Sequence, residues 1–432
     1  MYEEATQLLS FVAEGNEATY PMVYYALGYF ASKMGKKDEA LNLYKKAETM
    51  CPDYCFPNKL EEVLMLNDAM SLNPEGAKAP YYLGNFHYAA RIYDEAIACW
   101  EKSASIDDTY PTVLRNLSLA YYNKQHNPQK ALATLEKAYN LDTTDARILM
   151  ELDQLYKKLR YPHRQRLDFL EAHADVVEQR DDLCIERITL YNQLGEYQKA
   201  YDLINSRKFH PWEGGEGKVT SQYLLCRVEL AKIAIREGRF ADAVRLLKET
   251  EKYPDNLGEG KLSMAEENDI HYWMGCAYEG LGEEALAKEY FTKATKGSAE
   301  PAIAFFYNDQ QPDKIFYQGL AWRKLGEEDK ARSRFNRLIK HGEKHLFDKV
   351  KIDYFAVSLP DLLIWDDDLN VRNQIHCNLV MGMGYLGLGD KEQARKFLSE
   401  VARLDINHQA GKQLLEMCGY CLLYTSPSPR DA

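Results

Sequence analysis

One phrase recurs along this chain: a glycine followed five residues later by an alanine. Glycine supplies the left-handed backbone conformation that ends a helix, and alanine is small enough to lie where two helix backbones cross closely. The phrase therefore predicts antiparallel helix pairs joined by tight turns. Five copies of it are Gly195 with Ala200, Gly238 with Ala243, Gly282 with Ala287, Gly326 with Ala331, and Gly389 with Ala394.

Three further copies near the N-terminus keep the small residues in phase and add aromatic residues. They contain Tyr24, Leu27, Gly28, Ala40, Tyr44, Ala47 and Pro52; Leu83, Gly84, Ala96 and Trp100; and Ala120, Tyr121, Ala131, Leu135 and Ala138. A unit of this kind, about 34 residues long, is typical of the tetratricopeptide repeat. We predict an all-α fold, a right-handed α-α superhelix of about nine helix pairs, in which the marker alanines are buried.

The spacing of the marker alanines suggests four parts. The interval between Ala131 and Ala200 is long enough for a degenerate pair at 145–160 and 163–180. The last residues are rich in Ser and Pro and resemble a translated sequencing adapter rather than a helix. The expected parts are 1–140, helix pairs; 141–300, helix pairs with edge loops at 209–219 and 253–262; 301–417, helix pairs with an insert near 345–370; and 418–432, a disordered, non-native tail.

Charge and composition exclude several classes of protein. The formal net charge of −12 argues against nucleic acid as a partner, because a phosphate backbone requires a surplus of Lys and Arg. No apolar run reaches the length of a membrane span, and no signal peptide is visible, so we expect a cytoplasmic protein. Met1 already reads as part of a helix, which is compatible with a start further upstream. The nine cysteines are scattered along helical segments and predict buried thiols rather than disulfides.

Two loops share the string Gly-Glu-Gly-Lys, and each string begins fifteen residues after a marker alanine, at Gly215 and at Gly258. Neighbouring repeats stack in register, so we expect the two loops side by side. They either bind a ligand or partner, or fold the chain back through a structural turn whose ions pair with one another. A phosphate-binding loop is excluded because the required glycine and Ser or Thr are missing. The candidate binding residues are His210, Trp212, Glu213, Glu216, Lys218, Glu259 and Lys261.

Other polar clusters give weaker signals. Trp365 precedes three aspartates, which would attract a cation or form a solvated loop ending in a helix cap. His341 and His345 have helical spacing but lack a third metal ligand. No nucleophile motif is present. We therefore expect no catalytic residue, no metal and no cofactor in this chain.

Four strings together resemble one bacterial family, in which a domain of unknown function, number 5107, precedes a long tetratricopeptide region. They are Phe209–Val219, Arg180–Leu183, Pro111–Val113 with Arg115–Leu117, and Glu151–Tyr156. The resemblance implies a β-rich domain, similar to sugar-handling folds, in front of these repeats. No catalytic residue is established for the family, so none is carried over.

Two functions fit the sequence. In the first, the chain is a non-catalytic scaffold or interaction module that binds a protein segment or packs against the adjacent domain, as the concave surfaces of solenoids do. In the second, it is the helical part of a carbohydrate-binding or carbohydrate-active protein, in which Trp212 and His210 complete a glycan site built mainly by that domain. The sequence favours the first.

Overall fold

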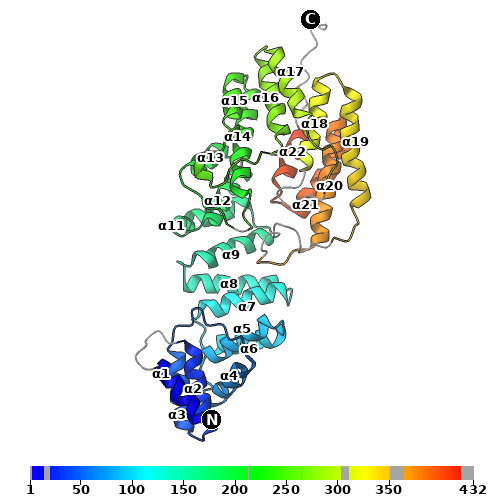
Figure 1. The fold of residues 1–432 in the computed structure, drawn as a ribbon. Helices are drawn as coiled ribbons and strands as arrows, with labels where there is room; N and C mark the ends of the chain where they lie inside the picture. Colours follow the sequence, from blue (N-terminus) through cyan, green and yellow to red (C-terminus); the bar gives the residue numbers. More distant parts are fainter. Residues whose placement is uncertain are drawn as a thin grey trace. The chain divides into compact units, whose positions relative to one another are not determined.

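A computed structural model describes residues 2–13, 20–212, 214–263, 265–302, 311–350 and 364–419. Within these residues the chain is built from α-helices and one short 3-10 helix, with no strand (Figure 1). The chain divides into two compact units. Unit 1 comprises 1–155 and 364–366, and unit 2 comprises 156–363 and 367–432. The division into four parts that we expected from the sequence remains a prediction, and the tail beyond residue 419 lies outside the described residues.

Unit 1 contains three helix pairs with marker alanines, α2–α3, α5–α6 and α7–α8, and most of α9, whose last residues belong to unit 2. Its helices are α1 (Tyr2–Ala13), α2 (Pro21–Lys33), α3 (Lys37–Glu48), α4 (Leu60–Leu72), α5 (Lys78–Ala89), α6 (Tyr93–Ile106), α7 (Pro111–Asn123), α8 (Pro128–Leu141) and α9 (Ala146–Lys158).

Unit 2 contains five such pairs, α12–α13, α14–α15, α16–α17, α18–α19 and α20–α21. The expected degenerate pair takes the form of α9, α10 and α11. The helices that follow α9 are α10 (His163–Ala172), α11 (Ala174–Val177), α12 (Asp181–Gln193), α13 (Tyr197–Asn205), α14 (Lys218–Arg236), α15 (Phe240–Lys248), the 3-10 helix η1 (Asp255–Leu257), α16 (Asn268–Gly280), α17 (Glu284–Ala294), α18 (Pro312–Lys324), α19 (Glu328–His345), α20 (Leu369–Leu388), α21 (Lys391–Leu404) and α22 (Gln409–Gly419).

Within the pairs, a glycine on the first helix faces a large side chain sixteen residues later on the second. A Cβ added to any of these glycines would lie 2.4 to 2.6 Å from that side chain, so only glycine allows the approach. The predicted burial of the marker alanines is confirmed, since all eight are at most 5% exposed. The solenoid fold predicted from these residues is therefore confirmed. The facing residues are Gly28 and Tyr44, Gly84 and Trp100, Gly275 and Phe291, Gly319 and Phe335, and Gly382 and Leu398.

The turn between the two helices of a pair has a left-handed residue five positions before the marker alanine. The five glycines of the recurring phrase have φ between +74° and +87°, as predicted. Gly35 takes the same place in the first pair, with φ +80°. Arg91 and His126 also adopt positive φ at this position, 64° and 51°, which the residue types do not predict. The turn geometry is thus kept even where the residue type does not favour it.

We expect Gly282→Ala to lower the free energy of unfolding by about 1 kcal/mol, because φ is +76° there and no atom lies within 4 Å of the added methyl. Gly260→Ala is the matched control, since its surroundings are equally open but its φ lies outside the left-handed region. Urea unfolding of both variants measures the difference. Equal stabilities would show that the turn does not require the left-handed conformation.

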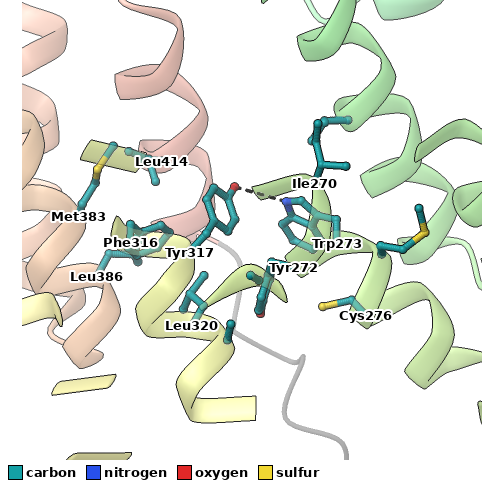
Figure 2. Close-up of a cluster of buried hydrophobic side chains, with 14 of the residues drawn as sticks. Ile270, Tyr272, Trp273, Cys276, Phe316, Tyr317, Leu320, Met383, Leu386 and Leu414 are labelled. Atoms are coloured by element: carbon teal, nitrogen blue, oxygen red, sulfur yellow. Dashed lines mark hydrogen bonds between the residues drawn. The ribbon is translucent and has the colours of Figure 1, made fainter. Parts of the chain in front are cut away.

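The core of unit 2 is continuous across successive pairs rather than confined to one of them. Trp273 on α16 donates its indole N–H to the hydroxyl of Tyr317 on α18 at 3.3 Å, and Phe316 packs beside Met383 and Leu386 of α20 (Figure 2). Leu414 of α22 joins the same cluster. Each pair therefore buries its apolar surface against its neighbours, as expected for a repeat array.

The C-terminal turn of unit 2 contacts the first helices of the same unit. The Asn407 side-chain oxygen, between α21 and α22, accepts from Arg166 on α10 at 3.4 Å, and Gln193 of α12 donates to the Asn407 backbone carbonyl. The side chain of Gln409, the first residue of α22, and that of Gln222 on α14 donate hydrogen bonds to each other at 3.0 and 2.9 Å. Segments about 200 residues apart in sequence thus hold one another within unit 2.

An ion cluster lies beneath this contact. The buried Arg166 donates to Glu186 at 2.7 Å, and Lys157 donates to the same carboxylate at 2.9 Å. Burial favours the neutral acid, but the charges and hydrogen bonds of Lys157 and Arg166 outweigh it and hold the pKa of Glu186 well below its ordinary value of 4.5. The folded state therefore binds fewer protons at this carboxylate than the unfolded chain, and its stabilising effect is complete only above about pH 4.5.

Glu186→Gln should lower the free energy of unfolding by about 3 kcal/mol at pH 7, because it removes the carboxylate that the buried Arg166 guanidinium and the Lys157 ammonium share. The difference from the unmodified chain should shrink as the pH falls below about 4.5, where the carboxylate's contribution is progressively lost. Urea unfolding at pH 7 and pH 3.5 tests both statements. Glu289→Gln, which breaks an exposed pair with Lys293, serves as the control. A difference that does not change with pH would contradict the assignment.

Candidate functional site

The two Gly-Glu-Gly-Lys loops lie side by side in unit 2, as predicted. The Phe209 amide donates to the Asn256 carbonyl at 2.8 Å, and the Asn256 side chain donates to the carbonyls of Ile204 and Arg207 at 2.8 and 2.9 Å. Gly258, with φ +78°, lies so close to the Phe209 carbonyl that a Cβ would come within 2.5 Å of its oxygen. The two loops are therefore joined through their backbones.

Glu259 of the second loop binds the first. Its carboxylate accepts from the Gly217 amide at 3.0 and 3.1 Å. Gly217, with φ +74°, is the residue that precedes α14, so the carboxylate lies at the positive end of that helix. Glu259 thus caps the N-terminus of α14, which is a structural role.

The remaining candidate residues have different surroundings. His210 contacts Asp181 through its backbone amide at 2.8 Å and through Nδ1 at 3.2 Å, with its side chain 74% exposed. Trp212 is half-buried, and its indole covers Gly215. The Lys261 ammonium pairs with Glu267 at 2.5 Å rather than with a residue of the first loop.

Glu216 is half-buried and Lys218 is exposed at the first turn of α14, and Glu213 lies outside the described residues. The structure therefore brings Glu259 to the first loop, whereas Lys261 lies apart from it. These contacts favour the structural interpretation of the two loops, and their role in binding remains a prediction.

Glu259→Ala should lower the free energy of unfolding by about 1 to 2 kcal/mol, because the Gly217 amide loses a charged acceptor. Hydrogen exchange at Gly217 should accelerate in the variant. Glu251→Ala is the control, since Glu251 is exposed and only its backbone carbonyl is used by Lys261. Unchanged exchange at Gly217 would show that Glu259 does not hold the loops together.

A second site lies in unit 1, at a residue that the sequence placed in a solvated loop. That expectation was half wrong: Asp368 caps α20 by accepting from the Asn370 amide at 2.8 Å, but Trp365 is only 1% exposed. Its indole N–H donates to the backbone carbonyl of Glu151 on α9 at 3.0 Å. Its ring lies edge-on to Tyr122 of α7, with centroids 5.2 Å apart. The tryptophan therefore occupies a pocket between α7 and α9.

Asn123, the last residue of α7, binds the main chain on both sides of Trp365. Its side-chain NH₂ donates to the Ile364 carbonyl at 2.8 Å, and its side-chain oxygen accepts from the Asp366 amide at 2.8 Å. One amide thus satisfies a backbone donor and a backbone acceptor of this segment. This contact depends on the backbone and not on the side chains of the segment that it holds.

Charged side chains surround the pocket. The buried Glu151 carboxylate accepts from Arg115 at 2.6 Å and from Arg147 at 3.0 Å. Lys124, directly after Asn123, pairs with Asp366 at 3.5 Å and lies 4.8 Å from the centre of the Tyr93 ring. Lys124 therefore places a positive charge against the segment, which suits an acidic residue at the position of Asp366, while Arg115 and Arg147 hold the Glu151 carboxylate.

Asn123, Tyr122 and Trp365 were not predicted as a site. Two signals pointed toward it: Arg115 and Glu151 belong to the strings that carry the family resemblance, and Trp365 stands alone in a segment without repeat periodicity. The cation site considered at the aspartates is not formed, since Asp366 pairs with Lys124 and Asp367 pairs with Lys158 at 3.0 Å.

Within the described part of the chain, no group of three or more His, Cys, Asp or Glu side chains is arranged to hold a metal ion. A search of the same residues finds no helix with the length and apolarity that crossing a bilayer requires.

Comparison with known proteins identifies tetratricopeptide repeats in both units. Residues 23–54 and 269–296 match one tetratricopeptide repeat model, and residues 315–341 match a second. Two crystal structures are similar at 16% sequence identity. YrrB, described as a TPR protein with an unusual peptide-binding site, covers 50% of this chain and 94% of its own, with a TM-score of 0.29. MamA covers 48% of this chain and 96% of its own, with a TM-score of 0.27.

Proposed function

We propose that this chain is a non-catalytic protein-interaction module and that unit 1 binds an extended protein segment between α7 and α9. The observation that carries the proposal is the pair of hydrogen bonds from Asn123 to the backbone on either side of a buried tryptophan. Recognition of an extended peptide combines main-chain hydrogen bonds, which give affinity, with a pocket for a side chain, which gives specificity. Both elements meet at this site.

The arrangement also suits binding rather than catalysis. Asn123, Tyr122 and the Glu151 carbonyl supply an amide, an aromatic edge and a backbone acceptor, none of which is a nucleophile or a general base at neutral pH. The Glu151 carboxylate is held by Arg115 and Arg147.

We also propose that the chain belongs to the domain-of-unknown-function 5107 group and packs beside the domain that precedes its repeats. Support comes from the strings that carry the resemblance, because they pair in space: Arg115 with Glu151, and Asp181 with His210. The upstream reading frame of the gene tests this, with a β-rich domain as the expected result. The glycan alternative gains no support, since Trp212 covers Gly215 and His210 contacts Asp181.

The interaction function is tested with the full-length chain carrying Trp365→Ala, which removes the side chain that fills the pocket. A labelled peptide with the sequence of residues 361–369 should bind this variant and raise its fluorescence anisotropy. Adding Asn123→Ala should weaken binding by about tenfold or more, because two backbone hydrogen bonds of about 1 kcal/mol each are lost.

Gln125→Ala is the matched control, because Gln125 is exposed in the turn that follows α7. It should leave peptide binding unchanged. A peptide that binds equally well with and without Asn123 would contradict the proposed site, and a peptide that does not bind at all would contradict the function.

A further inference from the structure

We propose that the partner of unit 1 presents a tryptophan followed directly by an acidic residue, and that it binds by replacing the chain's own Ile364–Asp366. This inference rests on the proposed function and specifies the partner. Residues 364–366 of the chain itself occupy the site, and each of their groups that contacts unit 1 indicates what a partner must offer.

The pocket selects tryptophan over other aromatic residues because of one acceptor. The Glu151 carbonyl lies 3.0 Å from the indole nitrogen, in a place where the tryptophan is almost fully buried. Carbonyl oxygens have two lone pairs, so Glu151 can accept this bond in addition to the bond within its helix. Phenylalanine would fill part of the volume but would leave the Glu151 carbonyl without its indole donor. Tyrosine has a donor, but its hydroxyl lies at the far end of the ring and not at the position of the indole nitrogen.

The next position favours a carboxylate. The Asp366 side chain lies 3.5 Å from the Lys124 ammonium and is 58% exposed, so the ion pair is screened and adds a modest preference for an acid directly after the tryptophan. Lys124 also lies 4.8 Å from the centre of the Tyr93 ring at the start of α6, which places the ion pair beside the α5–α6 turn. The contribution of this pair should fall with added salt, whereas that of the tryptophan should not.

The remaining contacts impose no sequence. Asn123 binds backbone groups that every residue except proline offers in full, so a segment from another protein can use them equally well. A partner therefore needs only an extended backbone, the tryptophan and the acid. A short motif of this kind is compatible with many surrounding sequences.

The occupant can be exchanged because it lies outside the helices of unit 1 and is distant in sequence from the residues that hold it. Residues 364–366 belong to unit 1, while the residues before and after them belong to unit 2. No helix of unit 1 contains any of the three, so their departure breaks no intrahelical hydrogen bond. A tethered segment competes at an effective concentration in the millimolar range, so a partner must displace it and its apparent affinity is reduced accordingly.

The test uses the full-length chain and three labelled peptides based on residues 361–369: the parent, one with Trp365→Phe and one with Asp366→Asn. On the Trp365→Ala chain we expect the parent to bind, the phenylalanine peptide to bind about tenfold more weakly, and the asparagine peptide about threefold more weakly at low salt. On the unmodified chain the parent should bind at least tenfold more weakly than on Trp365→Ala. Unfolding curves show whether Trp365→Ala remains folded.

If Trp365→Ala does not fold, Asp366→Lys takes its place. It puts two cations together at an exposed position, so it should loosen the internal segment and strengthen binding of the parent peptide relative to the unmodified chain. If no variant binds any of the peptides, the proposed function itself is contradicted. Binding without preference among the three peptides would overturn the partner motif but leave the interaction module standing. Equal binding of the parent peptide by the unmodified chain and by the Trp365→Ala chain would contradict the proposal that a partner displaces residues 364–366.

Size-exclusion chromatography distinguishes a second copy of the chain from a separate partner. A concentration-dependent dimer that disappears with Trp365→Ala would identify the occupant as residues 364–366 of another copy and would overturn the proposed partner. A chain that elutes as a monomer in both forms is the expected result.

Discussion

The close crossing of a glycine and a large side chain sixteen residues later is the contact on which five of the helix pairs depend. It brings the two backbones together and covers the crossing with a ring, as Tyr44 does at Gly28 and Phe335 at Gly319. The α7–α8 pair uses Ser118 instead, whose hydroxyl donates to the carbonyl of the marker Ala131 at 2.7 Å. In these six pairs the crossing is closed from within the pair, and the remaining surface of the first helix is available for contacts with other segments.

In unit 1 that surface carries a polar network that runs from pair to pair. Trp100 donates to Asn85 at 3.1 Å, Asn116 donates to Asn85 at 3.3 Å, and Arg115 contacts both Asn116 and Glu151. These bonds fix the positions of α5, α7 and α9 relative to one another within the unit. The pocket for Trp365 is rigid for that reason: the helices on both sides of it are connected by side chains that are themselves satisfied.

The features that recur with the repeat could be predicted from the sequence. Burial of Ala40 or Ala331 follows from phase alone, and the contact between the loops at Phe209 and Asn256 follows from equal offsets in stacked units. The sequence could not show that Arg91 and His126 adopt the glycine conformation, because the turn is imposed by packing of the pair rather than by these residues. It also could not place Trp365, whose partners are more than 200 residues away in sequence and lie outside any period.

The two sites differ in how their polar groups are satisfied, and this difference decides which of them is suited to recognition. At the Gly-Glu-Gly-Lys loops, Glu259 and Asn256 bind backbone groups at helix ends, so separating the loops would expose the first turn of α14. At the pocket of unit 1, Asn123 and the Glu151 carbonyl bind a segment that belongs to no helix. Its removal leaves the helices intact and two backbone-binding groups exposed, and another extended chain is the ligand that satisfies both.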